Sequence, residues 1–185
     1  DDAFLSPSTL SDLLAVAAGH PEYGIFIPLQ LTGDGRDVNP TLAAQLRRAP
    51  ARNLQTDLLL GRPRQVYPVQ ALMGAALLVK AEVVEVLGGF DPLFFVEGSE
   101  IDFCLRTVIS PWKVGFVPHA SVLHDCPERE RRGLDALRYA MHIFYTGSLF
   151  TLKRLNHSFF YMLLYQAARS LLAVAKSQRF GQVAR

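Results

Sequence analysis

Apolar residues recur at three- and four-residue intervals in the first two thirds of the chain, and this spacing predicts short amphipathic helices. The clearest covers residues 8–18, where Ser8 or Thr9 can cap the start of the helix and Gly19 can end it. The same spacing predicts helices over residues 41–46, 81–87 and 101–109. The pair Gly88 and Gly89 predicts the end of the helix over 81–87.

Short runs of β-branched and aromatic residues lie between these helices and predict strands. The run 23–29 is almost wholly apolar, which is typical of a buried strand, and the turn-rich residues 32–35 follow it. Further strands are predicted over residues 66–69, 75–79, 113–117 and 121–123, with Pro118 ending the strand 113–117. The alternation of helices with strands favours an α/β fold.

Residues 36–65 interrupt this alternation. They contain three prolines and six arginines, and they show a brief helical period only at 41–46. We therefore interpret the segment as a mobile or ligand-covering excursion from the fold.

The last third of the chain is rich in Leu, Phe, Tyr and Ala, and it predicts two helices over residues 134–152 and 158–175. The longest uncharged stretch, residues 155–168, has 14 residues. It is shorter than the roughly 20 residues that a membrane span needs. Two interpretations stay open: helices lying at an anionic membrane surface, or a core pair packed on the domain. Basic residues flank or interrupt the apolar stretch and suit the first interpretation: Lys153, Arg154, Arg169, Lys176, Arg179 and Arg185.

The composition and net charge of the chain exclude several classes of protein. A chain of 185 residues with 50% hydrophobic and 19% charged residues can bury a core and is not intrinsically disordered. The formal net charge of +2 is too small to indicate nucleic acid as the main partner. Two cysteines provide neither a disulfide framework nor paired zinc ligands, which favours a reducing compartment.

Three polar clusters are candidates for chemistry. They are Asp1 with Asp2, then Glu97 with Glu100 and Asp102, and His124 with Asp125 after a predicted strand. Carboxylates and turns at strand ends are where α/β sheets commonly place functional residues. Each cluster also has an ordinary structural interpretation, because termini are solvated and a single histidine is more often structural than a ligand. Glu100 and Asp102 would diverge on a helix and would share a pocket only in a turn or an extended segment.

Four segments in order closely resemble family 2 glycosyltransferases of the GT-A fold. They are GGFDPLFF at 88–95, EGSEIDFCLR at 97–106, WKVGFVP at 112–118 and VLH at 122–124. The ending FCLR is most similar to the rhamnosyltransferase-type members. The resemblance covers roughly residues 1–152. It implies an α/β, GT-A-like partial domain with a mixed sheet, followed by C-terminal amphipathic helices.

The resemblance also implies roles for individual residues. Asp2, with Asp1 beside it, matches the end of the family's DxD-type motif, and His124 matches a histidine that often completes the metal site. Together they would hold Mg²⁺ or Mn²⁺. Glu100 stands where the family usually has its catalytic Asp, and Asp102 matches a carboxylate two residues later, so either could be the base. The resemblance further implies a set of substrate-binding residues: Gly74, Gly89, Asp91, Glu97 and Arg106.

The family's nucleotide-binding half precedes the DxD-type motif, at which this chain begins. We therefore expect residues 1–133 to form the acceptor and metal half of the transferase domain. We expect residues 134–185 to form a C-terminal helical region, for which membrane association stays open. On this expectation the chain is a C-terminal portion that binds donor weakly by itself.

The function expected from the resemblance is an inverting, metal-dependent glycosyltransferase. It would transfer a sugar from a nucleotide-sugar, deoxythymidine-diphosphate rhamnose or a uridine-diphosphate sugar, to a polysaccharide or lipid-linked acceptor. Its expected place is the cytoplasmic face of the cell membrane, with no nucleic acid partner. The alternative is a non-catalytic relative that binds a glycan, a membrane or a protein. Two departures from the family pattern favour it slightly: Ser99 stands where the family often has Glu or Val, and Glu100 is one methylene longer than the usual Asp. A metal-dependent hydrolase has only the same carboxylates and histidine in its support.

Overall fold

The computed structural model describes residues 3–46, 51–94, 98–125 and 136–154, together with positions 160, 164–165, 167–168 and 171–172. The chain divides into two compact units. The first, the α/β unit, comprises Asp1–Asp91 and Glu100–Cys126. The second, the helical unit, comprises Pro92–Ser99 and Pro127–Arg185 and contains α7 (Ala136–Arg154).

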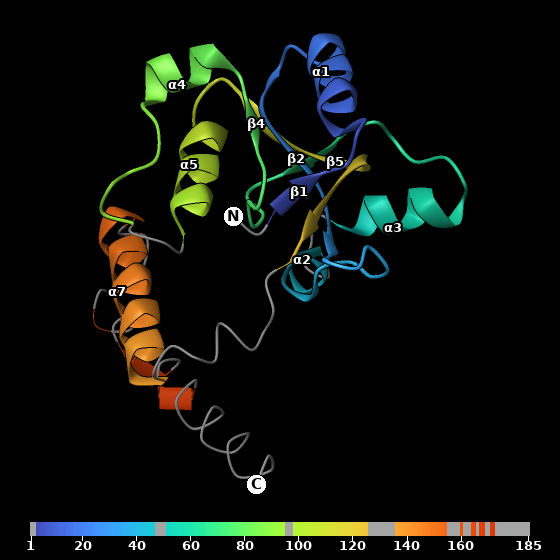
Figure 1. Cartoon of the computed structure of the whole chain (residues 1–185). Helices are drawn as coiled ribbons and strands as arrows, with labels where there is room; N and C mark the ends of the chain where they lie inside the picture. Colours follow the sequence, from blue (N-terminus) through green and yellow to red (C-terminus); the bar gives the residue numbers. More distant parts are fainter. Residues whose placement is uncertain are drawn as a thin grey trace, which may run out of the picture. The chain divides into compact units, whose positions relative to one another are not determined.

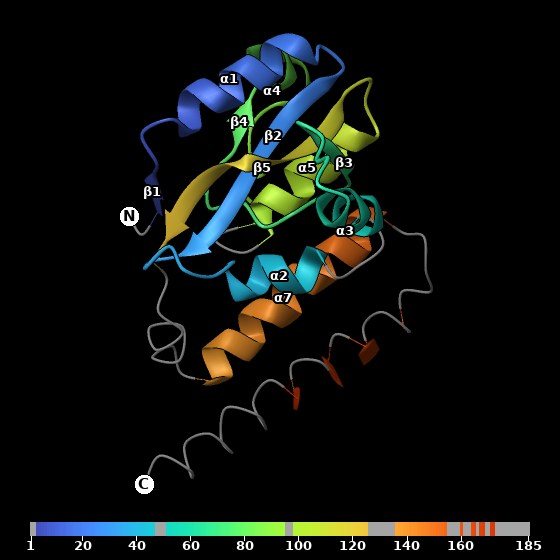
Figure 2. The same cartoon turned by 90° about the vertical axis from the view of Figure 1, so that its right-hand side faces the viewer.

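Five strands form one mixed sheet in the α/β unit. Its main path runs β1, β5, β2, β4, and β3 pairs with the first part of β5. Figure 2 shows the parallel strands β2 and β5 side by side, and the other strand pairs are antiparallel. The predicted α/β class and mixed sheet are therefore confirmed. The strand bounds are β1 (Ala3–Leu5), β2 (Tyr23–Thr32), β3 (Tyr67–Val69), β4 (Leu78–Val79) and β5 (Lys113–His124).

Helices cover both faces of this sheet (Figures 1 and 2). On one face α1 (Thr9–Gly19) buries Leu13 and Val16 against Phe26 of β2. The opposite face carries Ile25 and Ile27, since successive side chains of a strand alternate between faces. These isoleucines pack with side chains from the remaining helices of the unit: α2 (Pro40–Leu46), α3 (Ala51–Leu59), α4 (Ala81–Leu87) and α5 (Ser99–Val108).

The end of α4 and the start of α1 test the residues predicted to end and to cap these helices. Gly88 follows α4 with a φ of 70°, a left-handed conformation that glycine adopts at low cost, so the predicted end of this helix is confirmed. Neither predicted cap of α1 acts as one: Ser8 makes no capping hydrogen bond from its side chain, and the Thr9 hydroxyl donates to the Ser121 carbonyl instead. The Thr9 side chain therefore ties the start of α1 to β5 instead of capping the helix.

The interpretation of residues 36–65 as an excursion is wrong. The segment contains α3 as well as α2, and both helices contribute to the core through the buried side chains of Leu42 and Leu54. Asp57 anchors the end of α3, because its carboxylate accepts hydrogen bonds from Arg64 Nε at 2.8 Å and from the Tyr67 hydroxyl at 3.2 Å. We did not predict α3 because its segment is rich in arginine and because Leu54 is the leucine that anchors this helix in the core.

The predicted break at Pro118 is also wrong, because β5 continues to His124. Its register against β2 jumps from Pro28 opposite Val117 to Leu29 opposite Ser121. Residues 118–120 therefore form a bulge, a place where a strand tolerates a proline that cannot donate a ladder hydrogen bond. The short strand β1 was not predicted at all.

The helical unit confirms the helix predicted over 134–152, which the structure gives as α7. Within this unit the Phe150 ring lies 4.7 Å from that of Phe94, centroid to centroid. Gly98, with a φ of 90°, lies so close to Phe150 and Thr146 that a Cβ there would come within 3 Å of both side chains. Most of the helix predicted over 158–175 lies outside the described residues, and the described positions from 160 to 172 are helical.

Candidate functional site

The first candidate site lies where β2 and β5 end together. Their parallel register places Thr32 opposite His124, and the antiparallel register of β1 places Ala3 opposite the same histidine. His124 is 8% exposed, and its Nδ1 lies 3.4 Å from Asn39 Nδ2. This edge therefore brings the start of β1, the end of β2 and an oriented imidazole together.

Acidic side chains surround this edge. Asp125 follows His124, and its carboxylate lies so close to Gly33 that a Cβ there would approach Oδ1 to 2.5 Å. The Thr32 hydroxyl donates to Asp34 Oδ1, and this hydrogen bond, with another from the Arg36 N–H, holds the pKa of Asp34 below its ordinary value. Asp34 is thus ionised at neutral pH and adds a negative side chain to this edge.

Two of the three predicted metal ligands, Asp1 and Asp2, lie outside the described residues. Among the residues that the structure does describe, no three His, Cys, Asp or Glu side chains gather closely enough to hold a metal ion. The donor types at this strand edge, the His124 imidazole and the carboxylates of Asp34 and Asp125, are those that Mn²⁺ and Mg²⁺ accept. The chain enters the described sheet at Ala3, directly opposite that histidine.

The second candidate site surrounds Glu100, in the first turn of α5. Its side chain is half-buried and lies against Gly74, where an added Cβ would be 3.1 Å from Glu100 Cβ. A side chain at position 74 would therefore crowd the carboxylate's stem. A carboxylate in the first turn also interacts favourably with the positive end of the helix dipole.

Asp102 has different surroundings, although it is on the same helix. Its side chain is 3% exposed, and Oδ2 accepts a hydrogen bond from Arg106 Nε at 2.8 Å. Arg106 also donates to the carbonyls of Leu87 and Gly89, each at 2.8 Å. This network joins α5 to the end of α4. Because both carboxylates are on α5, their side chains leave the helix in different directions, as expected for residues two apart.

The structure thus separates the predicted residues into groups. His124 lies at the strand ends, Glu100 with Gly74 forms a second group, and Asp102, Arg106 and Gly89 form a third. Asp91 is half-buried after α4, and Glu97 lies outside the described residues.

Sequence reasoning missed two glutamines that hold the chain next to Gly74. Gln30 is fully buried, and its Nε2 donates to the Met73 carbonyl. Gln45 Oε1 accepts a hydrogen bond of 2.7 Å from the Met73 N–H. One signal could have found the first of them, since Gln30 is a polar residue within an apolar strand and a buried amide needs a partner. Asn39, which contacts His124, gave no comparable signal.

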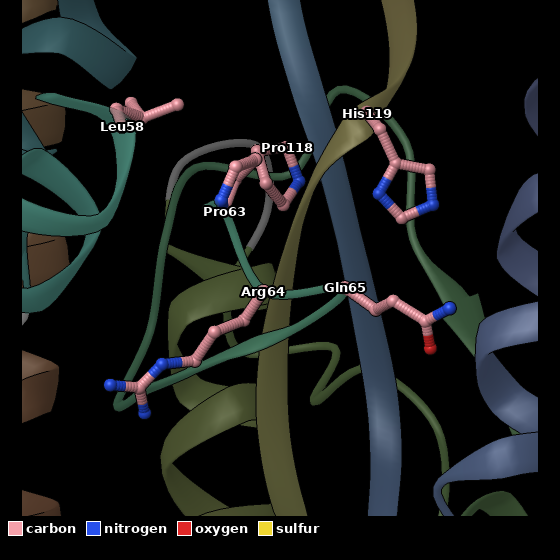
Figure 3. Close-up of a pocket in the computed structure, with 6 residues that line it drawn as sticks. All are labelled: Leu58, Pro63, Arg64, Gln65, Pro118 and His119. Carbon is pink, nitrogen blue, oxygen red and sulfur yellow. The ribbon is translucent and has the colours of Figure 1, made fainter. Parts of the chain in front are cut away.

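A hollow of about 400 Å³ lies elsewhere on the α/β unit, at the bulge of β5. Figure 3 shows its polar side chains diverging: Arg64 extends away from His119 and Gln65, while Pro63 and Pro118 occupy the centre of the view. None of the predicted site residues lines it. Its shape and lining do not provide convergent polar groups, which a specific small-molecule site needs.

Comparison with models of known protein families finds no family that matches the chain, and comparison with curated proteins finds no similar sequence. No helix among the described residues is both long enough and apolar enough to cross a membrane.

Proposed function

We propose that the chain acts as an inverting, metal-dependent glycosyltransferase that transfers a sugar from a nucleotide-sugar to a polysaccharide or lipid-linked acceptor. The observation that carries the proposal is the register of β1, β2 and β5. It places Ala3, the residue after the segment that resembles the DxD-type motif, and Thr32 opposite His124 at one edge of a mixed sheet. Ligand sites of α/β sheets commonly lie beyond strand ends of this kind.

His124 with Asp2 and Asp1 would hold the divalent cation, and Asn39 would orient the imidazole. When bound, the cation supplies positive charge that stabilises the departing diphosphate. Mn²⁺ and Mg²⁺ both fit a donor set of carboxylates and one histidine. The donor classes consistent with the resemblance remain deoxythymidine-diphosphate rhamnose and uridine-diphosphate sugars.

Between the two candidate bases, the greater exposure of its side chain favours Glu100. Asp102 accepts a hydrogen bond from Arg106 inside a buried network, whereas Glu100 is half-buried beside the small residue Gly74. In the proposed reaction the acceptor hydroxyl oxygen bonds to the anomeric carbon as the bond to the diphosphate breaks. Its proton passes to the Glu100 carboxylate. Attack from the face opposite the leaving group inverts the anomeric configuration.

Binding of the donor is tested by calorimetric titration of nucleotide-sugars, with and without Mn²⁺. The titration uses the chain and a form extended upstream of Asp1 as far as the reading frame allows. We expect Mn²⁺-dependent binding that His124→Ala abolishes. The matched control is His119→Ala, an exposed histidine on the bulge of the same strand. Absence of binding in every form, or equal loss in both variants, would contradict the metal site.

The base is tested by Glu100→Gln, which keeps the size of the side chain and removes its ability to take a proton. Transfer should fall by about 10²–10⁴-fold, the usual contribution of a general base, while the midpoint of unfolding changes little. Glu85→Gln, an exposed position on α4, is the matched control and should keep full transfer. Full transfer by Glu100→Gln would remove this residue from the mechanism.

A binding module without catalysis is the second candidate. One observation favours it: three predicted site residues, Asp102, Arg106 and Gly89, bind one another within the fold. This candidate predicts donor or glycan binding without transfer, and binding that Glu100→Gln leaves intact.

A further inference from the structure

The part of the chain from residue 136 onwards differs in charge from the rest. It contains seven of the 19 Lys and Arg residues but none of the 17 Asp and Glu residues. Residues 1–135 therefore carry 12 basic and 17 acidic side chains. The net charge of +2 is thus the sum of a negative region, 1–135, and a positive region, 136–185. A basic segment without acidic residues is attracted to anionic surfaces.

Away from its packed side, α7 carries three exposed apolar residues. Thr146 and Phe150 point toward Gly98 and Phe94 and form the packed side. Met141, Tyr145 and Leu152 lie four and seven residues apart, which places them on one side of the helix. They are 63%, 46% and 51% exposed. An ordinary surface helix would carry polar side chains on that side.

The described helical positions after α7 repeat this pattern. Phe160, Leu164 and Leu171 are 74%, 71% and 71% exposed, and Leu172 and Tyr165 are also exposed. Spacings of four and seven residues place the first three on one face of a helix. Among the exposed positions described from 136 onwards, Lys153 is the only charged one.

These observations do not depend on the proposed transferase activity. We propose that α7 and the described helical positions from 160 to 172 dock on an anionic lipid bilayer, with their exposed apolar side chains entering the interface. The excess positive charge of residues 136–185 attracts this part of the chain to the lipid headgroups. Apolar burial and attraction to anionic lipid together drive the binding of helices that lie in a membrane interface. The excess of positive charge favours a lipid surface over a second copy of the chain, because two such basic surfaces would repel each other.

The test is flotation of the full chain with phosphatidylcholine vesicles that contain or lack phosphatidylglycerol. We expect binding to the anionic vesicles only, weakened as salt rises through the physiological range. Replacing Arg169 and Lys176 by Gln should weaken binding about fivefold for each charge removed. The triple variant Phe160→Ser, Leu164→Ser and Leu171→Ser should weaken it tenfold or more, since each of these side chains loses apolar burial.

Matched controls test whether vesicle binding depends on these particular residues or on any exposed apolar side chain. Leu59→Ser and Val86→Ser replace exposed apolar residues of the α/β unit, at 88% and 66% exposure, and should leave vesicle binding unchanged. Binding that is absent at low salt, equal on neutral vesicles, or insensitive to the triple variant would overturn the proposal. So would a concentration-dependent dimer that the triple variant abolishes in a chain that does not bind vesicles, because the face would then join two copies. All of these outcomes are independent of donor binding and transfer.

Discussion

The α/β unit and the helical segment from residue 136 use similar apolar residues in opposite ways. In the α/β unit, aliphatic and aromatic side chains fill two buried clusters on the two faces of a sheet. In the helical segment, Thr146 is the only buried residue among the positions described, and Leu, Phe and Tyr side chains are exposed. Richness in apolar residues therefore predicts helices and strands, but it does not predict whether a face meets a core or another surface.

The largest expected change in stability that tests this contrast is at the ion pair of Asp102 and Arg106 in the α/β unit. Asp102→Ala leaves Arg106 partly buried without its carboxylate partner, and we expect a loss of about 3–5 kcal/mol in the free energy of unfolding. Urea denaturation measures it. Glu85→Ala, exposed on α4, should change that free energy by no more than about 0.5 kcal/mol. Equal small losses in both variants would mean that the network does not hold α5 to α4.

A smaller effect is expected from Gly24→Ala, which tests how closely the α/β core is packed. A Cβ there would lie 2.5 Å from Val83 Cγ2 and 2.9 Å from Trp112 Cβ, so the surrounding side chains would have to move. Overpacking of this kind costs about 1–3 kcal/mol. Gly19→Ala is the control, because its Cβ would meet no atom within 4 Å. A fully tolerated Gly24→Ala would indicate a loosely packed core.

Alkaline pH should weaken the α/β unit through Cys104. Burial raises the pKa of the Cys104 thiol from 9.0 to about 12, so between these values the folded chain keeps a proton that the unfolded chain loses. Stability is therefore complete below pH 9 and falls above it, by up to about 1.4 kcal/mol per pH unit. Denaturation as a function of pH, in a Cys126→Ser background, should show this fall. Cys104→Ala in the same background should reduce the slope, and an unchanged slope would contradict a buried, protonated thiol.

The smallest effect tests the helical segment directly. Leu164→Ala removes a side chain that is 71% exposed, and we expect the free energy of unfolding to change by no more than about 0.5 kcal/mol. Leu42→Ala, at a fully buried position of α2, should cost about 2–5 kcal/mol. If Leu164→Ala cost as much as Leu42→Ala, the exposed face would be part of a core and the contrast between the two regions would disappear.

The sequence pattern correctly predicted helices and strands whose ends and burial depend on residues close together in the chain. The helix over 81–87 was predicted from apolar spacing and ends at a left-handed glycine, as expected. The strand beginning at Tyr23 was predicted from its apolar run and lies at the centre of the sheet. α3 was missed because its burial depends on Leu54 and on Asp57, whose partners Arg64 and Tyr67 are supplied by the following loop and strand.

For the candidate site, too, the sequence predicted what depends on residue type and order but not what depends on contacts between distant residues. Sequence alone identified His124, Glu100 and Asp102 as chemically interesting residues, since their types and order resemble a known pattern. It could not distinguish the two carboxylates, because the difference lies in Arg106 one helical turn beyond Asp102 and in Gly74 packed from a distant loop. Gln30 and Gln45 were missed because both act on the backbone of Met73, across 43 and 28 residues of chain.

The amino-acid sequence by itself determined the alternation of helices and strands, the absence of acidic residues after residue 135 and the residue types available for chemistry. These properties depend on neighbours in the chain and on composition. Only the tertiary structure decided that β5 passes through a bulge to place His124 beside Ala3 and Thr32, and that Asp102 is held by Arg106. The reason is that strand register and side-chain contacts join residues far apart in sequence, and no local pattern contains them.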